Sequence, residues 1–282
     1  MLDGPDSPLS FPVNGLPHTV ETITLDDVKA YYAAHIPEHL TGVTVSSSLP
    51  QSRVVAAVEP LAQLEVTEAV RAPLADRPAI EGRTVYLVDK EGAAQSSIRT
   101  GQHGIAYDAL GDFYRAGLAN FVLGGTFSSR VNLNLREDKG FTYGARTGFS
   151  GGPELGSFRF SAEVNKDATA ASITEVLGEL EMYDESGMTA EDFEYMRSAI
   201  GQRDALQYET PGRKLGLLDN ILRYDLPLDY RSQQNTILQE TDRDTLNSLA
   251  NRLIDPDNMA IVVVGDEATI REEIEALGMP VV

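Results

Sequence analysis

A run of polar and small residues between positions 123 and 144 is the strongest candidate for chemistry in this sequence. It reads LGGTFSSR and, four residues later, LREDKGFTYG. Arg136 is expected at the end of a helix and Tyr143 at the start of a strand, so a turn at Gly140 can bring their side chains together. A guanidinium and a phenol held side by side suit a polarised carbonyl or a developing oxyanion. The structural alternative pairs Arg136 with an acid such as Glu137 and places Tyr143 in the core.

A second motif, HIPEH from His35 to His39, matches the H-x-x-E-H signature of inverted zincins letter for letter. That chemistry needs both histidines on one helical face, with the glutamate one turn away acting on a zinc-bound water. Pro37 lies inside the match, where it removes a backbone donor and moves Ile36 away from helical geometry. We therefore interpret the match as a chance occurrence in a polar turn, and we predict no metal site in this chain.

The composition is that of a strongly acidic protein with enough apolar residues for a sizeable core. Over 282 residues, 42% are hydrophobic and 23% are charged, which suits one large domain or two ordinary ones. A formal net charge of −20 argues against binding to nucleic acid or to anionic membranes. The absence of cysteine excludes disulfides, thiolate metal sites and cysteine nucleophiles. We also expect no membrane span, and no signal peptide is visible.

The elements that position the candidate residues follow from the hydrophobic patterning after Gly82. Strands are expected over residues 84–88, 94–101, 141–148 and 158–164, and helices over residues 108–123 and 128–139. Residues 124–127 should form a loop, with Ser128 capping the second helix and Gly140 ending it. Alternation along the third strand places Tyr143 on the same face as Ala145, Thr147 and Phe149.

The remainder of the chain is mostly helical. One helix carries an apolar stripe formed by Ile173, Val176, Leu177, Leu180 and Tyr183. Thr189 opens the next helix, Pro211-Gly212 breaks it, a late strand covers residues 259–264, and a last helix covers residues 268–276. Strands followed by a block of helices and one late strand predict an α+β fold, with a mainly antiparallel sheet and helices packed on one face.

The first 64 residues resemble the end of another domain. We expect a helix over residues 25–34, a strand over residues 41–48 and a helix over residues 50–64. The order helix, proline-containing turn and strand recurs near the end of the chain, where Pro256 follows Pro37 by 256 − 37 = 219 residues. This predicts the tail of a truncated N-terminal repeat over residues 1–64, a linker over 65–82 and a complete C-terminal domain over 83–282. A strand without neighbours would dock on its own chain or on a second copy, giving a homodimer.

The motif around Arg136 resembles the C-terminal repeat of the insulinase/pitrilysin zinc metallopeptidases. The resemblance rests on Gly124-Gly125-x-x-Ser128-Ser129-Arg130 and on Leu135-Arg136-Glu137-x-x-Gly140-x-x-Tyr143. The spacing of seven between Arg136 and Tyr143 matches the paired substrate-binding residues of that family. Weaker matches are Gln95, the helix start at Thr189 and the segment 261–266.

The resemblance implies a division of labour between two homologous repeats that close over an extended peptide. The first repeat carries the zinc, so this chain itself would hold no cofactor, and the zinc would lie in the catalytic repeat of the parent protein or of a partner. The second repeat supplies Arg136 and Tyr143, which would hold the peptide backbone and the tetrahedral intermediate. Gly124, Gly125, Ser128 and Arg130 would contribute to substrate binding.

Three functional interpretations remain open at this point. The first is the substrate-binding half of a zinc-dependent peptidase, inactive alone, whose partners are a peptide substrate and the catalytic repeat. The second is a non-catalytic relative that acts as a binding or assembly subunit. The third is an unrelated metal-binding α+β protein that uses His35 and His39. Arg136 and Tyr143 favour the first, and bacterial members with this style of repeat suggest the periplasm, with the cytoplasm as the alternative.

Overall fold

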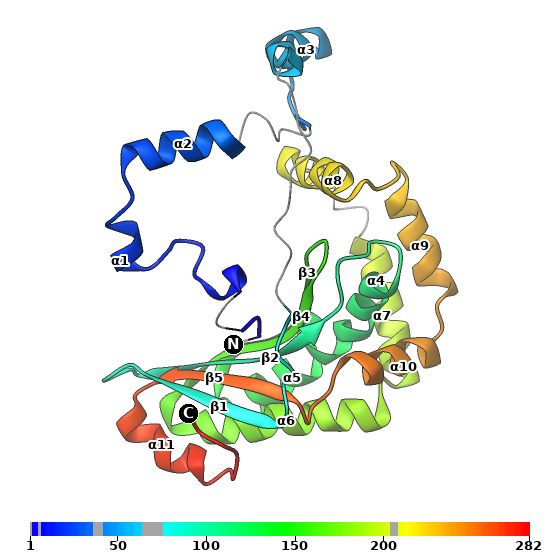
Figure 1. The fold of residues 1–282 in the computed structure, drawn as a ribbon. Coiled ribbons are helices and arrows are strands. Elements are labelled where there is room, and N and C mark those ends of the chain that lie inside the picture. The colour runs from blue at the N-terminus through cyan, green and yellow to red at the C-terminus, as the bar shows by residue number, and fades with distance from the viewer. Residues whose placement is uncertain (1, 5–6, 36–41, 64–75, 204–207) are drawn as a thin grey trace. The chain divides into compact units, whose positions relative to one another are not determined.

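The computed structural model describes residues 2–4, 7–35, 42–63, 76–203 and 208–282 (Figure 1). Contacts divide the chain into two units. Unit 1 comprises residues 3–78 and 203–228, and unit 2 comprises Leu2 with residues 79–202 and 229–282. The candidate residues between positions 123 and 144 therefore all lie in unit 2. The predicted boundaries at residues 64 and 82 stay predictions, because most of the proposed linker lies outside the described residues.

Unit 2 is built on a five-stranded sheet with the order β1-β5-β2-β4-β3. The strands are β1 (Arg83–Asp89), β2 (Gln95–Gly104), β3 (Thr142–Gly151), β4 (Gly156–Asn165) and β5 (Met259–Gly265). The pair β1–β5 is parallel and the other three pairs are antiparallel. The C-terminus extends the sheet beyond β1, because the Val85 amide donates to the Pro280 carbonyl at 2.8 Å. This confirms the predicted mainly antiparallel sheet.

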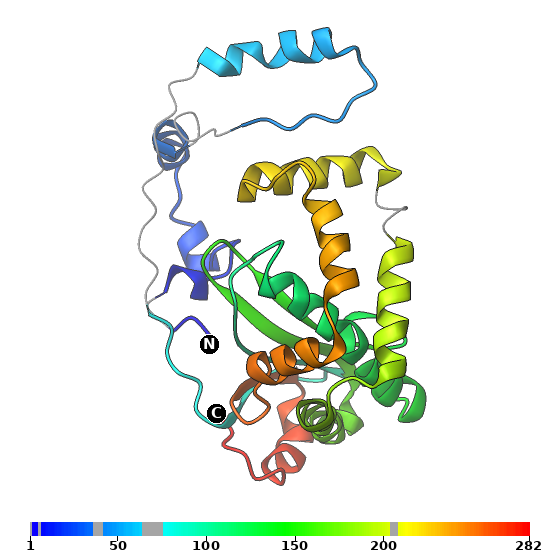
Figure 2. The same cartoon turned by 90° about the vertical axis from the view of Figure 1, so that its right-hand side faces the viewer.

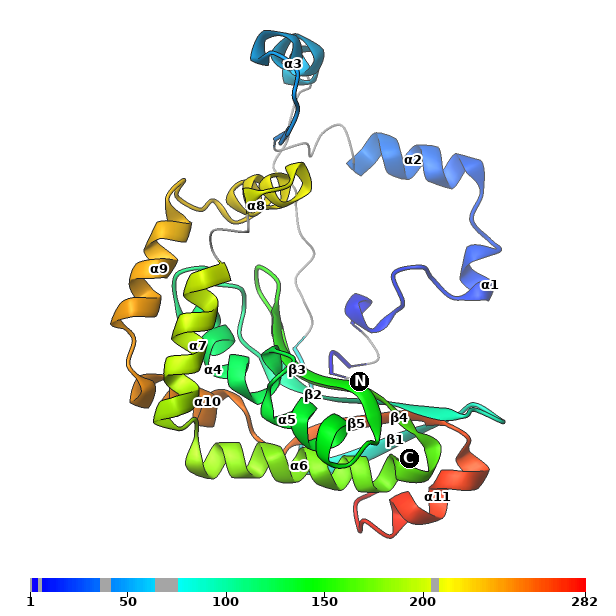
Figure 3. The ribbon, with the colours of Figure 1, turned by 180° about the vertical axis from the view of Figure 1, so that it is seen from behind.

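The helices of unit 2 cover one face of this sheet. They are α4 (Asp112–Asn120), α5 (Arg130–Asn132), α6 (Thr169–Ser186), α7 (Ala190–Arg203), α9 (Tyr230–Glu240), α10 (Arg243–Leu253) and α11 (Glu267–Glu275). Helix α6 packs on β2 and β4, α11 packs on β1, and α4 and α5 pack on β3. Figure 3 views the sheet from the side that α5 and α6 cover. Helices α7 and α9 lie side by side (Figures 1 and 2), where Arg197 donates to the Gln239 carbonyl at 2.8 Å.

The core lies between the sheet and α6, as the sequence periodicity predicts. On β4, Phe158, Phe160, Ala162 and Val164 are buried, whereas Arg159 and Glu163 are exposed. The apolar stripe of α6 is buried at all five predicted positions: Ile173, Val176, Leu177, Leu180 and Tyr183. Each buried valine, leucine, isoleucine or phenylalanine among them contributes about 1.5–3 kcal/mol by leaving water. The burial fixes which face of β4 and of its neighbours meets the helices.

The helices described in unit 1 are α1 (Pro17–Val20), α2 (Leu25–His35), α3 (Gln51–Val58) and α8 (Pro211–Tyr224). The predicted capping of α2 is confirmed, because the Thr24 amide donates to Asp27 at 2.8 Å and the Asp27 amide donates to the Thr24 hydroxyl at 3.2 Å. The helix predicted after Pro50 is also present, as α3 followed by a 3-10 segment from Glu59 to Gln63. None of the residues of these four helices is buried.

Two sequence-based assignments are wrong. Residues 42–48 form no strand, although a strand was expected there, and no strand is described elsewhere in unit 1 that could pair with this segment. An apolar extended segment becomes a strand only when a neighbouring backbone satisfies its amide and carbonyl groups. Gly124 and Gly125 do not form a loop either. They lie in a π-helical segment, η4 (Phe121–Gly125), that continues α4.

Candidate functional site

Two π-helical segments carry three of the candidate residues, with Gly124 and Gly125 in the first and Arg136 in the second. Segment η4 continues α4, and η5 (Leu133–Asp138) continues α5. π-Helical turns are rare in proteins, and those that occur are often found at functional sites. Arg136 lies on η5, Gly140 ends the helical segment with φ of 67°, and β3 begins two residues later. The predicted order of helix, glycine turn and strand is confirmed. The helix begins at Arg130 rather than Ser128, with Ser129 as the N-cap residue.

Arg136 is held in place while part of its guanidinium stays in contact with solvent. The guanidinium carbon lies 4.3 Å from the centre of the Phe127 ring, and Nη1 contacts the carboxylate of Glu137. The Arg136 side chain is 31% exposed. A cation stacked on an aromatic face keeps its edge free for hydrogen bonds in the plane. The structural alternative pairs Arg136 with a neighbouring acid, and the contact with Glu137 agrees with that part of it.

Tyr143 contradicts the other half of that alternative, because it is 91% exposed and does not lie in the core. The expected face of Tyr143 is also wrong. The β3–β4 register shifts between Thr142 and Ala145, so that Ala145 is fully buried and Tyr143 is not. A bulge of this kind inserts one residue and redirects a side chain. The Thr142 hydroxyl supports it, since Oγ1 accepts from the Gly144 amide at 3.1 Å and lies 2.6 Å from the Glu163 carbonyl oxygen.

Two buried asparagines, which sequence reasoning missed, fasten the candidate segment to β3. Asn120 Nδ2 donates to the Thr147 carbonyl at 2.9 Å, and Thr147 Oγ1 donates to Asn120 Oδ1 at 2.6 Å. Asn132 Oδ1 accepts from the Ala145 amide at 2.9 Å, and its Nδ2 donates to the Phe127 carbonyl at 2.6 Å. At Asn120 the sequence did offer a signal, because this polar residue directly precedes the buried apolar run from Phe121 to Leu123.

Gly124 is required by the closeness of η4 to β3. A Cβ atom at Gly124 would overlap the backbone nitrogen and the hydroxyl of Thr147. Gly125 is less crowded, since a Cβ there would lie 3.2 Å from the Asn120 carbonyl oxygen. The packing role of Gly124 is therefore observed, whereas its proposed role in substrate binding stays a prediction.

Ser128 and Arg130 are tied to neighbouring helices. Ser128 Oγ lies 2.8 Å from the Tyr195 hydroxyl of α7. Arg130 Nε lies 3.1 Å from Glu179 of α6, and its guanidinium lies 5.6 Å from the centre of the Tyr183 ring. Of the six predicted site residues, Ser128, Arg130 and Arg136 have side-chain partners, while Tyr143 is almost fully exposed.

A polar network on α6 fixes the helical segment that carries Arg136. Asn134 donates to Glu179 at 2.9 Å and to Glu175 at 3.0 Å, and Lys139 Nζ lies 2.7 Å from Glu175. The hydrogen bond from Lys139, assisted by Asn134, lowers the pKa of Glu175 below its ordinary value despite the opposing effect of burial. The segment that carries Arg136 is therefore bound to α6 on both sides of it, through Asn134 and through Lys139.

The described residues do not fit a zinc site. Within them, no group of three or more His, Asp or Glu side chains is placed to hold a metal ion. His35 is the last residue of α2, and its ring centre lies 4.6 Å from that of Tyr31. Pro37, Glu38 and His39 lie outside the described residues. No reaction step at zinc is therefore assigned to the residues that the structure describes.

The family model described as "Peptidase M16 inactive domain" matches residues 22–200. The match covers well over half of the chain, so the chain belongs to this family, which confirms the resemblance to insulinase-type zinc metallopeptidases. The match includes Arg136, Tyr143 and both glycines of the candidate segment. The chain is therefore an inactive, C-terminal-type domain of zinc protease-like proteins.

Curated relatives agree with this assignment, and solved structures share the fold. An uncharacterized zinc protease of Streptomyces coelicolor is 27% identical over 205 residues, which is 70% of this chain and 43% of the relative. A second one, of Rickettsia bellii, is 22% identical over 90% of this chain and 63% of its own length. An M16 inactive domain from Pseudomonas fluorescens has a TM-score of 0.76 at 22% identity, covering 90% of this chain and 60% of that one. The chain thus spans about half the length of the curated relatives.

None of the helices in the described part of the chain combines the length and apolar character needed to cross a membrane.

Gly124→Ala should destabilise unit 2 by about 1–3 kcal/mol, because the added methyl group forces η4 away from Thr147. Urea unfolding followed by far-UV circular dichroism measures this difference in the free energy of unfolding. Gly117→Ala in α4 is the matched control. Its Cβ meets nothing within 4 Å, so it should leave stability unchanged or raise it by about 0.5–1 kcal/mol. Equal stabilities of the two variants would contradict the close-contact argument.

Glu175→Gln should lower stability at pH 7 by up to about 1 kcal/mol, because it removes the charged acceptor of Lys139. The pKa of Glu175 is lowered in the folded state, so its contribution is complete above the ordinary glutamate pKa and is lost as the pH falls through the lowered value. The difference from the unmodified chain should therefore vanish in strong acid. Glu185→Gln, at an exposed position of the same helix, should show no such pH-dependent difference.

Proposed function

We propose that this chain is the substrate-binding half of a zinc-dependent peptidase that encloses and hydrolyses extended peptides. The observation that carries the proposal is the exposed Tyr143, set in a bulge seven residues after Arg136. Among the described residues of unit 2, no packing contact explains an exposed phenol at the start of a strand. The zinc protease names of the curated relatives support the peptidase class, and their greater length leaves room for a separate zinc-bearing repeat.

In this proposal the chain contributes binding and electrostatic stabilisation. The Tyr143 hydroxyl donates a hydrogen bond to the oxygen on which negative charge develops when the peptide carbonyl is attacked. The Arg136 guanidinium donates to a backbone carbonyl of the peptide and stabilises the same charge at longer range. Phe127 keeps the guanidinium plane fixed, so that little ordering is required when the peptide binds.

A non-catalytic binding or assembly subunit is the second candidate. It is favoured by the absence of a metal-binding cluster from the described residues and by the inactive-domain description of the family. A chain in a structure of complex III2 from Candida albicans has a TM-score of 0.67 over 95% of this chain at 13% identity, so the same fold also occurs in a multisubunit assembly. The two candidates differ in whether Tyr143 affects turnover.

Tyr143→Phe in the full-length peptidase should lower kcat by about 100-fold and change KM little, because a hydrogen bond to an oxyanion matters most in the transition state. Arg136→Ala should weaken both peptide binding and turnover. Tyr32→Phe, which removes the hydroxyl of an exposed tyrosine on α2, should leave both constants unchanged. A Tyr143→Phe enzyme with unmodified kcat would defeat the assignment.

The isolated chain of 282 residues should cleave no peptide and hold no stoichiometric zinc. Metal analysis after dialysis, together with a fluorogenic peptide assay with and without chelator, measures both properties. The variant His35→Ala/His39→Ala should give the same zinc titration as the unmodified chain. One tightly bound zinc per chain, lost in this variant, would instead favour the metal-binding interpretation.

A further inference from the structure

The face of the unit 2 sheet opposite the helices carries a compact group of arginines. The strand register places Arg99 on β2 and Arg146 on β3 directly opposite Ser161 of β4, so the three residues form one row. Arg159 lies two residues along β4, between Gly101 and Gly148 of the next row. It is therefore the diagonal neighbour of both other arginines, about 7–8 Å away along the sheet.

These guanidiniums are accessible and only partly neutralised. Arg99 is paired with Glu163 at 2.6 Å, and Ser97 donates to the same carboxylate at 2.9 Å. Arg146 and Arg159 are exposed and have no ion-pair partner among the described residues. Three guanidinium charges against one carboxylate leave two positive charges on this part of the sheet.

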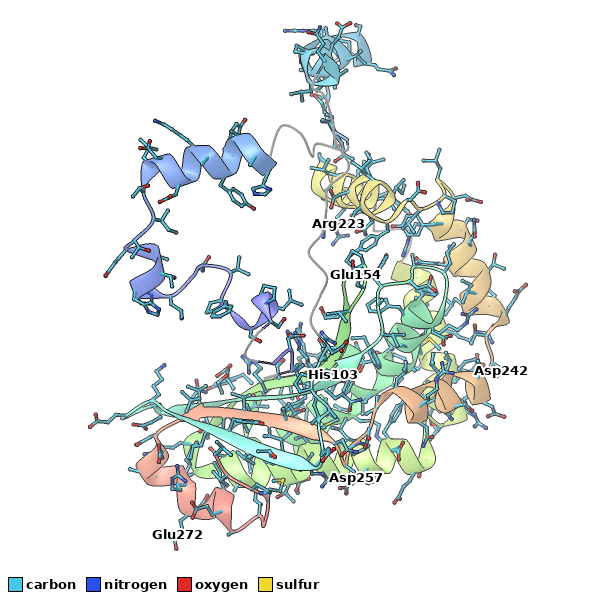
Figure 4. The ribbon with its side chains drawn as sticks, in the orientation of Figure 1. His103, Glu154, Arg223, Asp242, Asp257 and Glu272 are labelled. Carbon is cyan, nitrogen blue, oxygen red and sulfur yellow. The ribbon has the colours of Figure 1, made fainter. Side chains whose placement is uncertain are left out.

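The residues around the arginines leave room for a ligand. Gly148 flanks Arg159 on β3 and Ser161 separates Arg99 from Arg146, so no bulky strand side chain stands between Arg146 and the other two guanidiniums. On the β2 side of Arg159, the Leu2 side chain lies over Gly101. His103 continues the face along β2 (Figure 4), and its Nε2 lies 2.8 Å from the Leu2 carbonyl oxygen. In the direction of β1, the arginine row continues through the part-buried Val262 and Tyr86. The face is thus basic on β2, β3 and β4 and apolar on β5 and β1.

We propose that this arginine face binds acidic side chains of an extended peptide, which rests on the proposed peptide-binding function and names its substrate class. A concentrated positive patch in a chain of net charge −20 is complementary to carboxylates, whose planar geometry suits guanidinium hydrogen bonds. The apolar end of the row suits neighbouring apolar side chains of the same peptide. The large negative charge opposes a nucleic acid and also opposes a second copy of the chain.

Fluorescence anisotropy with two labelled peptides of equal length tests the proposal on the full chain. One peptide carries Asp and Glu, and the other carries Asn and Gln at the same positions. The acidic peptide should bind about tenfold more tightly or better at low salt, and the preference should weaken as salt is added. Arg146→Gln/Arg159→Gln should abolish the preference. Arg243→Gln/Arg252→Gln, which removes the same charge from exposed positions on α10, should retain it.

Each outcome separates this inference from the proposed function. Equal binding of the two peptides, or a preference that survives in Arg146→Gln/Arg159→Gln, would overturn the arginine face even if Arg136→Ala still weakens both peptides. Loss of the preference in Arg146→Gln/Arg159→Gln, combined with no effect of Arg136→Ala, would support the face and count against Arg136. A preference that appears only at concentrations where the chain dimerises would assign the face to a second copy and overturn the proposal.

Discussion

The attachment of the segment from Asn120 to Lys139 to the edge strand β3 is the constraint on which the candidate site depends. Strand β3 ends the sheet, so its outer backbone groups need partners from outside the sheet. The side-chain amides of Asn120 and Asn132 supply two of them, at Thr147 and Ala145. The same bonds fix the distance between the helical segment and the strand, and hence the positions from which Arg136 and Tyr143 project.

Around this attachment, polar side chains on one side are paired with α6, and on the other side Tyr143 is exposed. On the α6 side, Arg130, Asn134 and Lys139 are engaged by Glu175 and Glu179. On the other side, a bulge in β3 interrupts the alternation of side chains at Tyr143, and hydrogen bonds of the Thr142 hydroxyl stabilise this bulge. Burying a polar group without a partner costs free energy. We therefore assign a structural role to the paired groups facing α6, and we regard the exposed Tyr143 as a candidate for binding.

Periodicity and glycine signals were sufficient to predict the sheet, the α6 stripe and the glycine turn before β3, because burial and turn geometry act locally. Three features were not predictable in this way. The bulge at Tyr143 depends on pairing with β4. The π-helical segment 121–125 approaches Thr147, which is distant in sequence, and residues 42–48 have no strand partner among the described residues. The Arg136–Tyr143 spacing pointed to the family, but the partners of Arg130 and Ser128 became visible only in three dimensions.

A crystal structure of the full-length protein with a bound, uncleaved peptide tests the central claim most directly. The claim is that Arg136 and Tyr143 contact the peptide backbone from this inactive domain. It predicts the Tyr143 hydroxyl and an Arg136 nitrogen within hydrogen-bond distance, about 2.7–3.2 Å, of peptide backbone oxygens. A peptide bound elsewhere, with both side chains remaining in solvent, would contradict the account.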